Sequence, residues 1–240
     1  YAQYHTFLFR HGAIYPVKHP DMQTLEDLTG YERERNQVLR NTQVFLEGGT
    51  ASNVLLYGDA GTGKSTTVKA IANSLQKQGL RLLEVKKNEL YELPDILDEL
   101  SGNPLKFIIF IDDLAFDKED RTFSSLKTIL EGSLEPRPVN VAVYCTSNRR
   151  HLVRQNFSDR NGDEIDASET IQDKTSLADR FGLRILYSEL TKPQFIDMAM
   201  EMAVSKGVTM DPDNLKKAAV RWEARHTSRS PRSALQFAAS

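Results

Sequence analysis

Residues 58–65 read GDAGTGKS, and they directly follow the apolar run NVLLY at residues 53–57. Their spacing fits the pattern G-x-x-x-x-G-K-[ST], with the fixed places held by Gly58, Gly63, Lys64 and Ser65. Glycines let the backbone turn its N–H groups inward, and a helix that begins at the loop points its positive dipole end at the same place. The stretch therefore predicts a loop that binds phosphate. The alternative is a glycine-rich turn between a strand and a helix that holds no ligand.

Two side chains of this loop have predicted roles in nucleotide binding. Lys64 would bridge the β- and γ-phosphates, and the hydroxyl of Ser65 would coordinate Mg²⁺. We therefore predict ATP and magnesium as ligands. The other loop residues predicted to contact the nucleotide are Asp59, Ala60, Gly61, Thr62, Gly63 and Thr66.

The chain around the loop alternates between apolar runs and helical segments. Buried strands are predicted at NVLLY, LRLLEV, KFIIFID, NVAVYCTS and RILY, and helices at YERERNQVLRNTQVFLE, KSTTVKAIANSLQKQ, LPDILDELS and FSSLKTILEG. Continuously apolar strands separated by helices are typical of a parallel sheet with both faces covered. We therefore predict a doubly wound α/β core.

Three further segments complete the predicted organisation. Residues 1–27 show no sustained period and are interpreted as an N-terminal extension, the tail of an upstream segment, because the chain begins without Met. The core is predicted over residues 28–190. It includes a polar, acidic stretch at residues 156–176, which is interpreted as a flexible insertion or a functional loop. Residues 191–240 are wholly helical in pattern and predict a small helical subdomain.

Composition bears on several classes of function. Lys and Arg total 31 against 33 Asp and Glu, a formal charge of -2, so no overall basic field attracts DNA. A local basic patch remains possible, but the basic residues at 149–154 are too few to argue one, so DNA binding is possible but unsupported. The single cysteine, Cys145, lies in an apolar run and is interpreted as a core residue of a protein from a reducing compartment. Apolar runs such as FIIFI are too short to span a bilayer, and the scattered histidines do not fit a zinc site. We expect a cytoplasmic protein.

Two carboxylates follow the apolar strand in FIIFIDD at residues 107–113. In a doubly wound sheet, side chains at the carboxyl end of a strand point into the ligand crevice. Asp112 would hold Mg²⁺, and Asp113 would act as a base or orient the attacking water. The alternative is a pair of capping or surface aspartates.

A third strand ends in Thr146, Ser147 and Asn148. The amide of Asn148 would reach the γ-phosphate or the attacking water if this strand lies beside the one that ends at Asp112. Taken alone, these three residues are also common in turns and at helix caps, so a turn or a cap without a catalytic role stays open as an alternative.

The combined pattern resembles the AAA+ ATPases. It is most similar to a bacterial AAA+ family known as domain-of-unknown-function family 815, through TGYERER, NVLLYGDAGTGKST, FIIFIDDLAF, CTSNRRHL and SLADRFGLRI. The resemblance covers roughly residues 25–240. It implies a parallel five-stranded sheet in the order 5-1-4-3-2 with helices on both faces, a C-terminal helical lid, and nucleotide bound between them.

The resemblance also implies roles for individual residues. Asn148 matches the first sensor position, Arg180 the arginine finger that acts on a neighbouring subunit, and Arg232 the second sensor. Gly30 and Tyr31 match the segment that borders the adenine. The less favoured alternatives are a domain-boundary ion pair for Arg180 and a solvated charge on a helix for Arg232.

Two functions are compatible with these motifs. The first is a Mg²⁺-dependent ATPase that couples nucleotide state to assembly of a homo-oligomeric ring, such as a hexamer, and to remodelling of a protein client. The second is a nucleotide-gated binding module with slow turnover, similar to AAA+ helicase loaders. It is suggested by Asp112-Asp113, because most AAA+ hydrolases carry Asp-Glu there. A small-molecule kinase is a weaker third reading, since no acceptor pocket is indicated.

Overall fold

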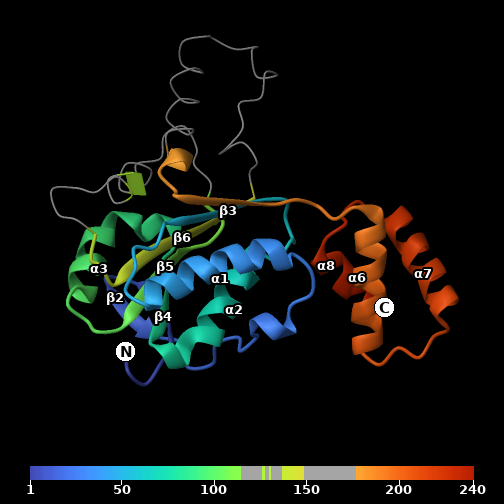
Figure 1. Ribbon diagram of the computed structural model, residues 1–240, viewed down its shortest axis with the longest axis horizontal. Coiled ribbons are helices and arrows are strands. Elements are labelled where there is room, and N and C mark those ends of the chain that lie inside the picture. Colours follow the sequence, from blue (N-terminus) through green and yellow to red (C-terminus); the bar gives the residue numbers. More distant parts are fainter. Residues whose placement is uncertain (115–125, 128–129, 131–136, 149–176) are drawn as a thin grey trace, which may run out of the picture.

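The computed structural model describes residues 1–114, 126–127, 130, 137–148 and 177–240 (Figure 1). Of the helix predicted at FSSLKTILEG, only Leu126, Lys127 and Leu130 are described, and all three are helical. The predicted acidic stretch at residues 156–176 and the basic residues at 149–154 lie outside the described residues.

The described strands form one sheet. Their bounds are Thr6–Arg10 (β1), Ala13–Pro16 (β2), Val54–Gly58 (β3), Leu80–Glu84 (β4), Lys106–Ile111 (β5), Val141–Ser147 (β6) and Leu183–Tyr187 (β7). Their order in the sheet is β2-β1-β4-β5-β6-β3-β7. Every neighbouring pair is parallel except the β1–β2 hairpin. The predicted number of five strands is therefore wrong, because the described sheet has seven.

The two additional strands come from residues 1–27, which were interpreted from sequence as an N-terminal extension, the tail of an upstream segment. His11 and Gly12 both have positive φ angles, 51° and 73°, in the tight turn between them. Turns of this kind match the twist of paired strands. Phe7 and Phe9 are buried, whereas Thr6, Leu8 and Arg10 are more exposed, and β1 pairs with the edge of β4. The segment is thus part of the α/β core.

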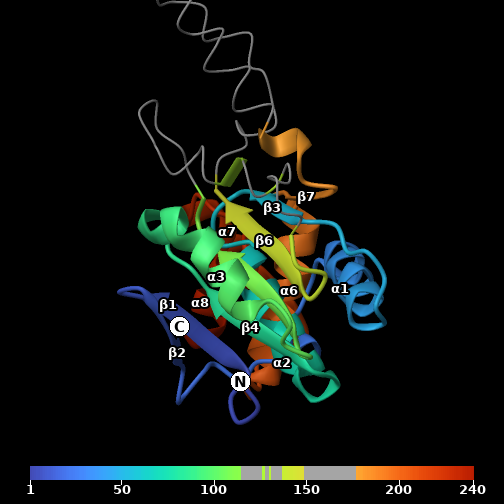
Figure 2. The same cartoon turned by 90° about the vertical axis from the view of Figure 1, so that its left-hand side faces the viewer.

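Helices cover both faces of the sheet (Figure 2). Helix α3 (Leu93–Leu100) packs on one face, and helices α1 (Glu32–Leu46) and α2 (Lys64–Leu75) pack on the other. Successive strand residues point to opposite faces, so Leu55 joins the α3 side and Leu56 the α1–α2 side. Short 3-10 helices span Leu25–Asp27, Gln76–Gln78 and Lys87–Glu92.

Cys145 lies in the middle of this core. Its side chain is fully buried in the cluster on the α3 side of the sheet, as predicted. Burial raises the pKa of its thiol well above the usual range, so the reactive thiolate is disfavoured.

The C-terminal residues form a separate helical unit beside the sheet (Figure 1). It consists of α6 (Lys192–Ser205), α7 (Pro212–Arg225) and α8 (Pro231–Ala239), which share two small apolar clusters. Each helix begins with a polar cap, namely Thr191, Asp211 and Ser230, and with a proline in its first turn. Residues 188–191 link β7 to this unit.

Because β3, β5, β6 and β7 are parallel, their carboxyl ends meet at one edge of the sheet. Helix α2 begins at this same edge. The strand order therefore brings together residues that are far apart in the chain. No described helix is both long enough and apolar enough to cross a membrane.

Asn73 on α2 ties the N-terminal segment to the core, and this gives a prediction for stability. Its buried side chain donates to the carbonyls of Asp21 and Gln23, both at 2.7 Å, and its Oδ1 lies 3.2 Å from His5 Nε2. Asn73→Ala is expected to lower the free energy of unfolding by about 1–3 kcal/mol, measured in urea, because buried polar groups lose their partners. The exposed Asn36 is the control, and Asn36→Ala should change stability by less than about 0.5 kcal/mol. Equal effects of the two changes would contradict the prediction.

Candidate active site

A cleft of about 490 Å³ opens at this edge of the sheet, between the glycine loop, the start of α1 and the start of α8. This volume suits a small-molecule ligand. The described residues that line it are Gln23, 27–31, Arg35, 60–67, Asp112, Asp113, Thr146, Asn148, Tyr187, Met202, Pro231, Arg232 and Leu235. The wall thus combines the loop, the ends of β5, β6 and β7, the segment before and at the start of α1, and the helical unit.

The glycine loop has the backbone that its sequence predicts. Gly58, Gly61 and Gly63 have positive φ angles of 130°, 76° and 90°. At Gly58 a side chain is also excluded by space, because a Cβ there would lie 2.2 Å from the carbonyl oxygen of Tyr187. Helical hydrogen bonding begins where Thr67 N–H donates to Gly63 O at 2.8 Å. The amides that precede Thr67 in the first turn of α2 face an anion site.

Lys64 places a buried ammonium at the centre of this loop. Its Nζ donates to the carbonyl oxygens of Asp59 at 2.6 Å and Gly58 at 3.2 Å. Burial lowers the pKa of Lys64, and the nearby carboxylates of Asp59, Asp113 and Asp112 partly offset that effect. An anion in the cleft would therefore favour the charged form of this lysine.

Asp112 joins the loop to the two central strands. Its Oδ1 accepts hydrogen bonds from Ser65 Oγ at 2.5 Å and from Thr146 Oγ1 at 2.6 Å. Hydroxyl and carboxylate oxygens are the hard ligands that Mg²⁺ prefers. The residues predicted to hold the metal, Ser65 and Asp112, are thus in contact, and their chemistry fits Mg²⁺.

Asp113 has a strained backbone at the edge of the cleft. Its φ is 52°, which is uncommon for a residue with a side chain. Its N–H donates to Thr146 Oγ1 at 2.9 Å and to Asp112 Oδ1 at 3.1 Å, and its Oδ1 accepts from Asn148 Nδ2 at 2.7 Å. Asp113 and Asn148 therefore act as a hydrogen-bonded pair, and both line the cleft.

Arg232 reaches the cleft from the helical unit. It follows Ser230, whose hydroxyl caps α8. The N–H of Arg232 donates to the carbonyl of Gly61 at 3.4 Å, and a Cβ on Gly61 would lie 3.3 Å from Arg232 Cβ. The start of α8 thus touches the glycine loop directly.

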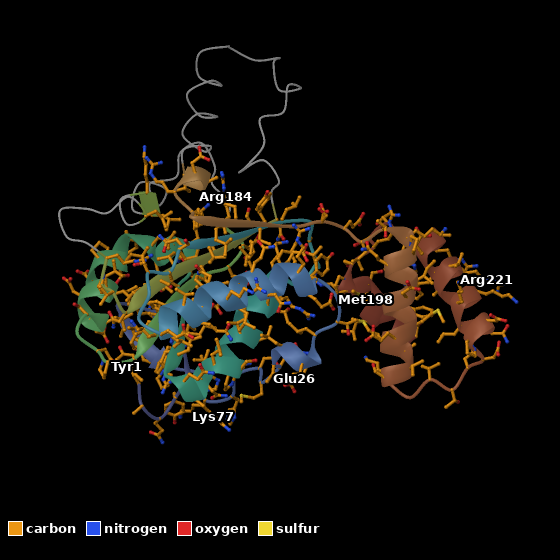
Figure 3. The ribbon with its side chains drawn as sticks, in the orientation of Figure 1. Tyr1, Glu26, Lys77, Arg184, Met198 and Arg221 are labelled. Atoms are coloured by element: carbon orange, nitrogen blue, oxygen red, sulfur yellow. The ribbon has the colours of Figure 1, made fainter. Side chains whose placement is uncertain are left out.

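Gly30 and Tyr31 lie at the other end of the cleft. The ring of Tyr31 stacks on that of Tyr187, with centroids 5.0 Å apart and planes inclined by 21°. Burial is the main cause that raises the pKa of both hydroxyls, that of Tyr187 to about 12. A Cβ on Gly30 would lie 2.3 Å from Met198 Cε, and Figure 3 shows Met198 on the side of α6 that faces the core. The stacked rings of Tyr31 and Tyr187 thus lie at this end of the cleft.

Two of the predicted site residues do not line the cleft. The carboxylate of Asp59 accepts a hydrogen bond from Glu189 N–H at 2.7 Å, so it is turned to the linker. Arg180 precedes β7 at its amino end, whereas the glycine loop follows the carboxyl end of the parallel neighbour β3. These ends are about 16 Å apart at 3.3 Å per residue, which is longer than an arginine side chain.

Several residues in the cleft wall were not predicted from sequence, and two of them have polar side chains with informative contacts. The first is Thr146, whose hydroxyl contacts both aspartates, although the prediction named only Asn148 of that tripeptide. The second is Arg35, whose Nη2 donates to Glu32 Oε1 at 3.2 Å and whose buried Nη1 has no hydrogen-bond partner among the described residues. Arg35 shares the buried face of α1 with Val38 and Thr42, so helical spacing could have predicted that its side chain is buried.

Comparison with known proteins places this site in context. The model of a family described as protein of unknown function (DUF815) matches residues 2–240. A proteasome-activating nucleotidase from Haloferax volcanii is 31% identical over 125 residues, which are 46% of this chain and 31% of that protein. An AAA-ATPase from Arabidopsis thaliana is 32% identical over 108 residues, 41% of this chain and 20% of that protein. The chain thus spans less than a third of either relative, and both support a nucleotide-binding ATPase.

Solved structures show the same fold. A RuvB variant from Thermotoga maritima has a TM-score of 0.60 at 18% identity and covers 90% of this chain and 64% of RuvB. The ORC1 protein of Aeropyrum pernix, solved in complex with DNA, has a TM-score of 0.58 at 19% identity and covers 87% of this chain and 58% of ORC1. At these identities the likeness concerns the α/β fold with its mostly parallel sheet.

The backbone of Asp113 gives a prediction that needs no ligand. Asp113→Gly and Asp113→Ala both remove the carboxylate, but only glycine adopts a positive φ without strain. Asp113→Gly should therefore be more stable than Asp113→Ala by about 1 kcal/mol in urea unfolding. Asp213, which is exposed at the start of α7, supplies the control pair, and there the order should reverse because glycine weakens a helix. If Asp113→Ala and Asp113→Gly have the same free energy of unfolding, the backbone at position 113 is not strained.

Proposed function

This chain belongs to the family described as protein of unknown function (DUF815) and has the fold of AAA+ P-loop ATPases, and we propose that it binds ATP with Mg²⁺ and hydrolyses ATP to ADP and phosphate. The observation that carries the proposal is the contact of Ser65 and Thr146 with Asp112 Oδ1, at 2.5 Å and 2.6 Å, opposite the buried ammonium of Lys64. A carboxylate and an ammonium at a helix start form a site for a triphosphate with its metal.

ATP would be held along the length of the cleft. The amides of the glycine loop and the first turn of α2 would bind the phosphates, and Lys64 would exchange its bonds to loop carbonyls for bonds to phosphate oxygens. Gly30 and Tyr31 would border the adenine at the end of the cleft where Tyr31 stacks on Tyr187. Ser65 and Asp112 would hold Mg²⁺, which when bound neutralises charge on the phosphate oxygens.

Hydrolysis needs a base beside the γ-phosphate. Asp113 would accept a proton from the attacking water. At the same time the water oxygen would bond to the γ-phosphorus, and the bond between the γ-phosphorus and the bridging oxygen would break, so that ADP leaves with that oxygen. Asn148, which donates to Asp113 Oδ1, would fix the direction of that carboxylate. Arg232 would place a positive charge near the phosphates from the helical unit, which would act as a lid over the cleft.

Arg180 supports a shared site. Since it lies at the opposite end of β7 from the glycine loop, it would act on ATP bound to a neighbouring copy of the chain. A ring of identical subunits meets this requirement, because head-to-tail contacts close into rings. We propose that ATP turnover in such a ring drives remodelling of a protein client.

A slow, nucleotide-gated binding module is the second candidate. The favouring observation is the hydrogen bond from Asn148 to Asp113 Oδ1 at 2.7 Å, which competes with water for the base. In this case the ATP-bound state would hold the client, as in the helicase loaders that the sequence resembles.

Lys64 gives a pH prediction that tests nucleotide binding. Burial lowers the pKa of Lys64 in the free protein, and bound phosphate would raise it, so Mg·ATP binding should take up protons, and this uptake should grow as the pH rises toward the lowered pKa of the free protein. Affinity should accordingly fall as the pH rises through the lowered pKa of the free protein. Calorimetry in buffers of different ionisation enthalpy measures this uptake.

The control for this experiment is Lys64→Arg, because a guanidinium stays protonated throughout the range. The uptake at alkaline pH should vanish in this variant. Equal uptake by both proteins would show that another group titrates, and no binding by the native chain would refute the nucleotide site.

A pair of variants tests hydrolysis and the shared site together. Asp113→Asn and Arg180→Ala should each lower steady-state ATP turnover by at least about 100-fold, while both still bind ATP. In an equimolar mixture, about a quarter of the sites combine an intact Asp113 with a neighbour's intact Arg180, and turnover should recover to about that fraction.

Asp98→Asn is the control, because Asp98 is an exposed carboxylate on α3 and should leave turnover unchanged. Full activity of Asp113→Asn would refute the proposed base. A mixture no more active than its separate components would refute the shared site.

A further inference from the structure

We infer that Tyr31 and Asp59 clamp one peptide group of the linker between β7 and α6, and so set the position of the helical unit over the cleft. In this role they are positioning residues. The consequence for turnover rests on the proposed function, whereas the clamp itself does not.

The two side chains hold opposite ends of the same peptide group. Tyr31 Oη donates to the carbonyl oxygen of Ser188 at 2.5 Å, and Asp59 Oδ2 accepts from the N–H of Glu189 at 2.7 Å. That carbonyl and that N–H belong to one peptide unit. Because a peptide unit is planar, bonds at both of its ends fix its orientation as well as its place.

Both residues of the clamp are anchored to the strand that precedes the linker, Tyr31 by its ring and Asp59 by its backbone. The ring of Tyr31 stacks on Tyr187, the last residue of β7, and the N–H of Asp59 donates to Tyr187 O at 3.0 Å. Tyr31 itself adopts a left-handed φ of 57° at the start of α1. The clamp therefore controls how the chain leaves the sheet and turns toward α6.

Hydrogen bonds connect the linker to the start of α8, so the orientation of the clamped peptide group affects the position of that helix end. The side chain of Glu189 accepts from Arg229 N–H at 3.0 Å, and the N–H of Leu190 donates to Arg229 O at 2.9 Å. Arg229 directly precedes Ser230, the cap of α8, and the N–H of Arg232 bonds to the glycine loop. A change in the clamped peptide group would thus shift Arg232 relative to the phosphates.

Electrostatics explains why an aspartate in this loop needs such a partner. A carboxylate that faced the cleft would repel the phosphates that the loop amides and Lys64 attract. The Glu189 N–H turns the Asp59 side chain toward the linker instead. The backbone carbonyl of Asp59 accepts a hydrogen bond from Lys64 Nζ at 2.6 Å. If Lys64 left this carbonyl to bind a phosphate, the contacts of Asp59 in the clamp would therefore change.

The test uses three variants of the full chain without nucleotide. Asp59→Ala removes the acceptor, Asp59→Asn keeps a carbonyl oxygen in its place, and Tyr31→Phe removes only the hydroxyl. By site-resolved hydrogen exchange, the Glu189 amide should exchange at least about tenfold faster in Asp59→Ala. It should exchange a few-fold faster in Tyr31→Phe and stay near the native rate in Asp59→Asn.

A distance measurement reports the position of the helical unit. Lys77 and Arg221 are exposed and lie on the core and on the helical unit (Figure 3), and the native cysteine is buried, so spin labels at Lys77→Cys and Arg221→Cys are selective. The distance distribution should broaden in Asp59→Ala and remain as in the parent in Asp59→Asn. Asp213→Ala and Tyr91→Phe, which change exposed residues away from the linker, should leave exchange and distance unchanged.

ATP turnover separates positioning from loss of fold. In Asp59→Ala, kcat should fall at least about tenfold while the affinity for ATP is unchanged or higher, since a negative charge leaves the loop. A variant that is merely less stable would lose both together. Native exchange and distances in Asp59→Ala would overturn the clamp. If Asp59→Ala shows the expected exchange and distances but an unchanged kcat, the role of the clamp in turnover would be overturned. If the native chain neither binds nor hydrolyses ATP, only the proposed function would be overturned.

Discussion

The hydrogen bonds that meet at Asp112 join three parts of the chain that are distant in sequence. Ser65 comes from the start of α2, Asp112 follows β5, and Thr146 ends β6. These residues meet because the carboxyl ends of parallel strands lie at one edge of the sheet. The loop is thereby held to the two central strands, and every other residue of the candidate site is placed relative to this contact.

The helical unit is attached to the same edge by contacts of a different kind. It has its own apolar clusters, and its polar contacts with the core include, in the described part of the chain, the start of α8 against Gly61 and the linker against Tyr31 and Asp59. A unit held in this way keeps its internal structure when its attachment changes. Such an arrangement suits a protein in which the state of the cleft is to be transmitted to a partner.

Sequence patterns identified the central strands and the helices well, because those segments are long, apolar and regularly spaced. They missed the hairpin at residues 6–16, whose two strands have five and four residues and lie at the edge of the sheet. So short a hairpin is not stable alone. Its structure comes from the pairing of β1 with β4 and from the burial of Phe7 and Phe9, neither of which is a local property.

The sequence by itself determined the glycine loop, since its conformation depends on residues that are adjacent in the chain: glycines at positive φ and a helix that starts at Lys64. It also placed Asp112 and Asp113 at the end of a buried strand. Only the tertiary structure decided where side chains point. Asp59 lies in the loop motif but bonds to Glu189, and Thr146 joins the two aspartates across neighbouring strands. The physical reason is that hydrogen bonds between distant residues depend on the strand order and the path of the linker.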